Sequence, residues 1–173
     1  MTMKKIYALL FVLICFASVK AQTVTMGQGT TTTYTSCSMN ILDNGGADGN
    51  YGNNRCDSLL IYSNSASTNC VQVDINLTDF DIHPSDTLFI YDAPGRVDSM
   101  LLVALNNDLV ANISSSVLSY AATIRNPTGA LFLYFKTDGD SVGSGFYITT
   151  TCTAPCQRIN VQFDTVLSNK YPV

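Results

Sequence analysis

The stretch CVQVDINLTDFDIHPSDTLFIYD, residues 70–92, contains two predicted β-strands joined by a short loop. Residues 71–80 open with a strict alternation of apolar and polar side chains, the period-two pattern of a strand that buries one face. After the loop, residues 87–91 form a second apolar run, which Asp86 precedes and Asp92 follows. Carboxylates at the ends of strands are candidate ligands for a cation. The stretch therefore predicts a strand pair with an acidic rim.

Short apolar runs separated by turn residues continue along the rest of the chain. No window shows a sustained apolar period of 3.6 residues, so no helix is predicted, and Thr, Tyr, Val, Ile and Phe dominate the runs. Many short strands at even spacing predict an all-β sandwich or barrel. The predicted strands span residues 58–62, 71–80, 87–91, 100–105, 117–125, 130–136 and 146–151.

The first 21 residues have the composition of a secretory signal peptide. Lys4 and Lys5 precede an apolar stretch of about a dozen residues, and small residues favour cleavage near Ala21–Gln22. No later segment reaches the ~20 apolar residues that a transmembrane helix needs. We therefore expect an exported protein, secreted or held at the cell surface, without a membrane span.

The charge of the expected mature chain is strongly negative. Its 152 residues are enough for one domain, and they carry six basic residues against thirteen acidic ones, all of them Asp. This balance argues against nucleic acid as a partner and favours cations or basic partners. The alternative is that the acidity serves only to keep an exported protein soluble.

The organisation predicted from these patterns has four parts. After the signal peptide, residues 22–36 form a Thr-rich extended lead, and residues 37–152 form the main domain. Residues 153–173 contain a Pro-bearing joint and a fresh alternating run, which predicts the start of a further domain, with a disordered tail as the alternative. Five cysteines remain after cleavage, and in an oxidising compartment they are expected to pair. The odd count suggests that Cys156 pairs with a residue further downstream.

Several short motifs occur in the order found in one extracellular family. Taken together, residues 37–152 resemble the CUB domain of exported bacterial proteins. The matching pieces are a Gly-rich turn at 43–46, an N-Y-x-N-N-like segment at 49–54, a strand that ends in Phe80-Asp81, the D-x-L-x-I-Y-D strand at 86–92, the F-x-x-D element at 135–138 and the closing G-x-G-F at 143–146.

The resemblance implies a fold and a type of function. It implies a jelly-roll-like β-sandwich of two antiparallel sheets and a binding module rather than a catalyst. The expected activity is recognition of an extracellular protein or glycan, assisted by Ca²⁺. The alternatives are an accessory domain of a larger secreted enzyme, such as a protease, and a structural spacer in a surface array.

The resemblance also implies a set of calcium ligands. Asp86 and Asp138 match two of the family's acidic ligands, while His83 stands where the family has Glu. An imidazole nitrogen is a poor ligand for Ca²⁺, which prefers six to eight oxygens. Further oxygens are expected from Asp81, Asp140 or Ser141. The alternative is that Asp86 and Asp138 only cap turns at the ends of strands.

Two disulfide pairings follow from the same layout. Cys56 and Cys70 flank one strand and a polar turn, and Cys37 and Cys152 bracket the domain. The main rival pairs Cys37 with Cys56 and Cys70 with Cys152. Structural zinc is disfavoured, because the cysteines lack the C-x2-C spacing of zinc sites and there is no pair of histidines.

Catalysis is not predicted. A Ser-His-Asp site would have to use His83, the single histidine, and no G-x-S-x-G motif is present. The chain contains no Glu, so a glycosidase would need two facing Asp residues. We therefore expect a binding module and not an enzyme.

Overall fold

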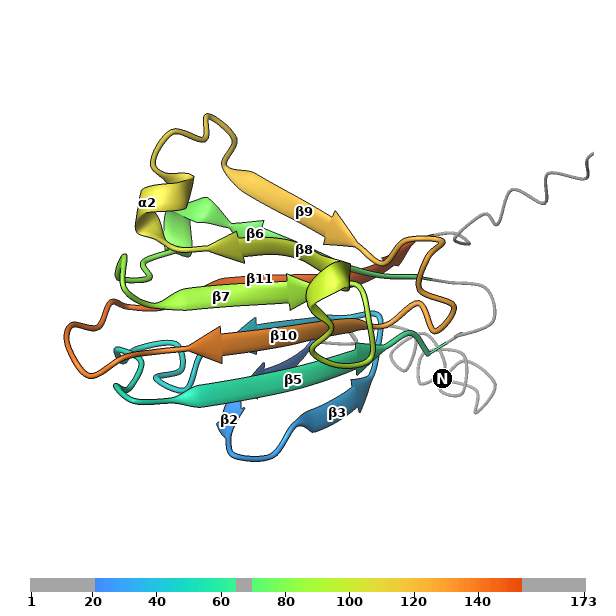
Figure 1. The fold of residues 1–173 in the computed structure, drawn as a ribbon, viewed down its shortest axis with the longest axis horizontal. Helices are drawn as coiled ribbons and strands as arrows, with labels where there is room; N and C mark the ends of the chain where they lie inside the picture. Colours follow the sequence, from blue (N-terminus) through green and yellow to red (C-terminus); the bar gives the residue numbers. More distant parts are fainter. Residues whose placement is uncertain (1–20, 65–69, 154–173) are drawn as a thin grey trace, which may run out of the picture.

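Two β-sheets pack face to face in the computed structural model, which describes residues 21–64 and 70–153 (Figure 1). One sheet has the strand order β1-β4-β11-β6-β9, and the other has the order β2-β5-β10-β7-β8, with β3 also paired to β5. This confirms the predicted all-β sandwich. The strands are β1 (Gln22–Thr25), β2 (Gly27–Gln28), β3 (Thr32–Thr35), β4 (Met39–Leu42), β5 (Cys56–Tyr62), β6 (Cys70–Asn76), β7 (Thr87–Tyr91), β8 (Leu101–Leu105), β9 (Val117–Ala121), β10 (Leu131–Lys136) and β11 (Tyr147–Thr153).

The alternation of side chains explains how the sheets face each other. In β6, Val71, Val73 and Ile75 are fully buried, whereas Gln72 and Asp74 on the opposite face are partly exposed. Along most of the strands, the residues that face the core alternate with residues that do not, as the pleat requires. The core between the sheets includes Met26, Met39, Ile41, Leu59, Ile61, Ile82, Leu88, Ile90, Leu131, Leu133, Phe135 and Ile148.

The lead segment, residues 22–36, contributes strands to both sheets. β1 pairs with β4 and β3 pairs with β5, in each case in parallel, while β2 pairs antiparallel with β5. The other strand pairs of the sandwich are antiparallel, as predicted. The lead therefore covers one edge of the sandwich, and β8 and β9 form the opposite edges (Figure 1).

Two predicted strands are shorter in the structure, and each ends at a polar side chain that bonds to the backbone. β6 ends at Asn76, whose side chain accepts the Thr78 N–H and begins a 3₁₀ turn, η1 (Leu77–Asp79). β9 ends at Ala121, because the Thr123 N–H turns toward the carboxylate of Asp92. The other predicted strands agree with the structure within two residues.

Besides η1, three elements of the main domain were not predicted from the sequence. β4 lies just after Cys37, at the start of the turn-rich region, and is only four residues long. A second 3₁₀ turn, η2 (Asp98–Met100), precedes β8, and a four-residue helix, α2 (Asn107–Val110), follows it. Asn106 starts α2 by accepting the Leu109 N–H, a cap too short to leave a helical period in the sequence.

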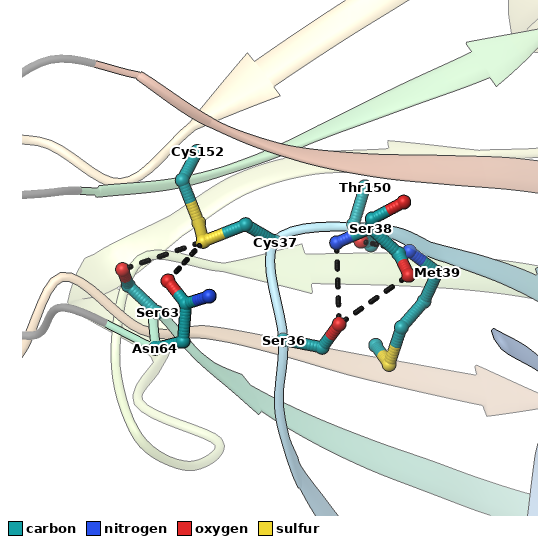
Figure 2. Close-up of a disulfide and its surroundings, with 8 residues drawn as sticks. All are labelled: Ser36, Cys37, Ser38, Met39, Ser63, Asn64, Thr150 and Cys152. Atoms are coloured by element: carbon teal, nitrogen blue, oxygen red, sulfur yellow. Dashed lines mark hydrogen bonds between the residues drawn. A yellow bond between two sulfur atoms is a disulfide. The ribbon is translucent and has the colours of Figure 1, made fainter. Parts of the chain in front are cut away.

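One disulfide joins the beginning and the end of the sandwich. Cys37 and Cys152 are bonded, with their Cα atoms 5.0 Å apart, which confirms that predicted pair. Figure 2 shows Ser63 and Asn64, just after β5, lying against the sulfur of Cys37, so the bridge lies where β4, β5 and β11 come together.

The predicted Cys56–Cys70 bridge is wrong. Cys56 is an exposed free thiol, and Cys70 is disulfide-bonded to a partner that is not among the described residues. The rival pairing fails for the same reason. The pairing register explains the result, because β5 and β6 belong to different sheets and Cys56 lies opposite Lys136 on β10.

Within the described part of the chain, no helix is long and apolar enough to cross a membrane. The predicted signal peptide, residues 1–21, lies outside the described residues except for Ala21, and so does nearly all of the predicted linker and further domain at 153–173, including Cys156.

Candidate functional site

The residues of the predicted acidic rim lie at one end of the sandwich. The loops that precede β5, β7 and β11, together with the loop that carries α2, meet at this end, on the left in Figure 1. Backbone hydrogen bonds connect them: the Asn54 N–H donates to the Asp138 carbonyl over 2.6 Å, and the Asn107 N–H donates to the Ile82 carbonyl over 2.9 Å. Residues that are far apart in the sequence are therefore held close together here.

Asp86 lies at the centre of this end and is fully buried. One carboxylate oxygen, Oδ2, accepts the hydroxyl proton of Tyr51 over 2.6 Å, and the other, Oδ1, accepts the backbone N–H of Asp138 over 2.7 Å. Its own N–H donates to the His83 carbonyl. Both carboxylate oxygens thus have partners within the chain, as a buried carboxylate requires.

Tyr51 links two of these loops through its hydroxyl group. The hydroxyl donates to Asp86 and accepts the backbone N–H of His83 over 3.0 Å. Burial and the hydrogen bond to Asp86 raise the pKa of Tyr51 well above its ordinary value, so the phenol stays protonated as a donor. The sequence marked Tyr51 only as part of the N-Y-x-N-N-like segment, and nothing there predicted this contact.

Asp138 joins Asp86 as the resemblance implied, but through its backbone. Its side chain is partly exposed and accepts the backbone N–H of Asp140 over 2.9 Å. That bond, a second one from the Ser85 side chain and the nearby His83 together hold the pKa of Asp138 below its ordinary value. The carboxylate of Asp138 is therefore ionised at neutral pH.

His83 occupies the position where the family has Glu. Its ring nitrogen Nδ1 lies 2.8 Å from the hydroxyl oxygen of Ser85. A hydrogen-bonded histidine and serine therefore occupy the position where the family has a carboxylate ligand.

The further oxygen donors that the sequence suggested do not gather around Asp86. Asp81 accepts the Asn107 side-chain N–H over 2.8 Å and the Ser144 backbone N–H over 2.9 Å. Asp140 and Ser141 are exposed, and the Asp140 carbonyl accepts the Asn53 side chain. These residues stabilise the loops among themselves.

The closing motif Gly143-Ser-Gly-Phe146 is required by two neighbouring aspartates. Asp43 is fully buried and accepts the Gly45 and Phe146 N–H groups over 2.7 and 3.0 Å. A Cβ atom on Gly145, where φ is +89°, would lie 1.7 Å from Asp43 Oδ2, and one on Gly143 would lie 2.1 Å from the Asp81 carbonyl. Only glycine fits at these two positions.

Solved structures with the same fold include parts of a zebrafish protein and of a human protein. The full extracellular region of zebrafish Gpr126/Adgrg6 matches 72% of this chain with a TM-score of 0.53, and the CUB1-EGF-CUB2 domain of human MASP-1/3 matches 70% with a TM-score of 0.51. The fold is CUB-like.

The similarity extends to the fold and not to the sequence. Both structures are 13% identical to the CUB-like chain, which spans 15% of the zebrafish protein and 42% of the human one. No protein-family model matches the chain, and no curated protein matches it in sequence.

The acidic end of this CUB-like domain does not fit a calcium ion. Both oxygens of Asp86 are already bonded, His83 offers nitrogen where an oxygen is needed, and Asp81 bonds to Asn107 and Ser144. Among residues 21–64 and 70–153, no group of three or more His, Cys, Asp or Glu side chains could hold a metal. The donor set falls short of the six to eight oxygens that Ca²⁺ takes.

Asp81 makes the CUB-like domain sensitive to acid. The Ser144 N–H, followed by the Asn107 side chain, lowers the pKa of Asp81 below 3.8, so its contribution to stability is present above that pH and is lost as the pH falls through the lower folded-state value. In Asp81→Asn we expect the free energy of unfolding, measured with urea, to change less between about pH 5 and pH 2 than in the wild type. An unchanged slope would contradict this role.

A groove beside the acidic end of the CUB-like domain is lined by both apolar and acidic side chains. Its volume is about 520 Å³. Leu42, Phe80 and Phe146 line it with largely buried side chains, and Tyr147 adds a partly exposed ring. Two exposed carboxylates, of Asp79 and Asp81, and the polar residues Thr23, Thr78 and Ser144 complete the lining, with Gly46 and Ala47. The sequence did not predict this groove, because its residues come from five separate segments.

Proposed function

We propose that this chain is an extracellular recognition module that binds a protein partner through a lysine or arginine side chain lodged in the groove. The groove carries the proposal, since it combines an apolar floor of Leu42, Phe80 and Phe146 with the carboxylates of Asp79 and Asp81. The long stem of a basic side chain packs on apolar surface while its charged head meets a carboxylate.

The charge of the surroundings supports a cationic ligand. None of the residues that line the groove is basic, and Asp138 and Asp140 add negative charge at the neighbouring end of the sandwich. Asp81 remains ionised because its hydrogen bonds lower its pKa. A neutral glycan would donate hydroxyl hydrogen bonds to the carboxylates but would gain no charge–charge attraction, so the negative charge of the groove favours a basic protein partner.

The disulfides and the fold support an extracellular setting. Cys37–Cys152 and the bonded Cys70 are typical of proteins that fold in an oxidising compartment. One of the structures with this fold is described as an extracellular region. The module itself carries recognition, and catalysis is not part of the proposal.

The experiment that tests this proposal compares arginine with its neutral isostere. In a ¹H–¹⁵N spectrum of residues 22–173, Nα-acetyl-arginine methylamide is expected to shift the Ser144 and Tyr147 signals saturably, with a Kd on the order of 1 mM. The citrulline derivative, which has the same shape without the charge, is expected to bind at least about 5-fold more weakly.

A pair of variants locates the binding. Asp79→Asn combined with Asp81→Asn is expected to abolish the preference for arginine, whereas Asp98→Asn, on the loop before β8, leaves it unchanged. Raising the salt to 1 M is expected to weaken arginine binding, because the Debye length falls to about 3 Å. Equal binding of arginine and citrulline would exclude the basic-partner proposal and favour a spacer or an accessory domain.

A further inference from the structure

The loops at the acidic end are held together by one continuous group of hydrogen bonds. The Tyr51 hydroxyl contacts Asp86 and His83, Asp86 contacts the Asp138 backbone, and the Asp138 carbonyl accepts the Asn54 N–H. The group thus ties the loops before β5, β7 and β11 to one another. A metal ion bound by carboxylates from the same loops would perform the same mechanical task.

We infer that Tyr51, Asp86 and the Asp138 backbone hold this end of the CUB-like sandwich without calcium, and that His83 is the residue that makes the end independent of calcium. The inference concerns the order of the loops and not the identity of the partner. One consequence rests on the proposed function: if the groove binds a basic side chain, that binding persists when calcium is removed.

The geometry of Asp86 is the first support. Asp86 has 0% exposure, and each of its carboxylate oxygens accepts a hydrogen bond from the chain itself, from a phenol at 2.6 Å and from an amide at 2.7 Å. The buried carboxylate therefore has partners without a cation. Asp86 therefore serves as the hub of the hydrogen bonds.

The chemistry at position 83 is the second support. Both backbone groups of His83 belong to this set of hydrogen bonds. Its N–H donates to the Tyr51 hydroxyl, and its carbonyl accepts the Asp86 N–H. Its ring points to Ser85, with Nδ1 2.8 Å from the hydroxyl. The backbone of His83 thus helps to connect the loops, while its side chain lacks the oxygen ligand that a calcium site needs.

Thermal unfolding of residues 22–173 tests the inference without any partner. The melting temperature of the wild type is expected to be the same, within about 1 °C, in 1 mM EDTA and in 10 mM CaCl₂. A calcium-dependent rise of more than about 3 °C in the wild type would overturn the inference, since a ligand at 10–100 times its Kd stabilises a folded domain by that much or more.

Two variants test separately whether the hydrogen bonds stabilise this end and whether the missing carboxylate at position 83 prevents calcium binding. Tyr51→Phe removes the shared hydroxyl and is expected to lower the melting temperature by roughly 5–10 °C, equally in EDTA and in CaCl₂. His83→Glu keeps the backbone contacts and supplies the absent carboxylate, so a rise of about 4 °C or more in CaCl₂ is expected for this variant.

The outcomes distinguish the two halves of the inference. If Tyr51→Phe melts like the wild type in EDTA, the hydrogen bonds do not hold the loops. If His83→Glu responds to calcium no more than the wild type, His83 is not what excludes the ion. Arginine binding that fails in the wild type, with an unchanged melting behaviour, would remove the proposed function and leave this inference standing.

Discussion

Gly145→Ala is expected to destabilise the domain by at least about 3 kcal/mol, measured by urea denaturation. The new Cβ would lie 1.7 Å from Asp43 Oδ2, in a position where φ is +89°. Alanine tolerates neither the backbone conformation nor the contact, and Asp43 cannot move without giving up its bonds to Gly45 and Phe146.

Two other glycines separate the contributions to this effect. Gly46 also has a positive φ, +74°, but no atom lies within 4 Å of a Cβ built there, so Gly46→Ala is expected to cost about 1–2 kcal/mol from the backbone alone. Gly95 has neither constraint, and Gly95→Ala is expected to change stability by less than about 0.5 kcal/mol. Equal losses at Gly145 and Gly46 would show that the Asp43 contact is unimportant.

Removal of the disulfide is expected to have the largest effect on stability. The double change Cys37→Ser with Cys152→Ser opens a loop with a sequence separation of 115 residues, and the loop-entropy relation predicts a loss of about 4–5 kcal/mol in the free energy of unfolding. Changing both cysteines avoids creating another free thiol in addition to that of Cys56. A lower urea midpoint at pH 7 is the measurement.

Cys56→Ser provides the matched control. Its thiol is exposed and free, so this change is expected to leave the urea midpoint within the error of the wild type. A large loss in Cys56→Ser would mean that Cys56, and not the Cys37–Cys152 bridge, is important for stability.

The sequence was sufficient for the fold because the strands that build the core carry a local signal. The alternation of Val71, Val73 and Ile75 fixes which face of β6 is buried, and this information does not depend on the neighbours of the strand. The local pattern does not show which strands pair with each other. It gives no sign that β5 and β6 lie in separate sheets, and the wrong Cys56–Cys70 prediction followed from treating neighbours in the sequence as neighbours in space.

The candidate site was predictable only in part. The motif order brought Asp86 and Asp138 together correctly, but it implied two side chains around an ion, whereas the structure joins the carboxylate of one to the backbone of the other. The hydrogen bond of the Tyr51 hydroxyl and the groove both depend on how loops far apart in the sequence pack together. No local sequence pattern predicts such packing. The poor fit of this end to calcium, by contrast, was already indicated in the sequence by the nitrogen donor of His83.

The Cys37–Cys152 bridge also determines how the molecule responds to tension. If the chain is pulled at both ends, the force enters through residues 21–36, reaches Cys37 and crosses directly to Cys152 through the sulfur atoms. For a force applied at residues 21 and 153, the residues between the two cysteines form a closed loop outside this covalent path. Within residues 21–153, the lead strands are then the part that can peel away, which lengthens the molecule by at most about 55 Å before the covalent path is taut. The acidic end and all the residues that line the groove except Thr23 lie inside that loop, so they remain covalently enclosed when the lead strands peel away.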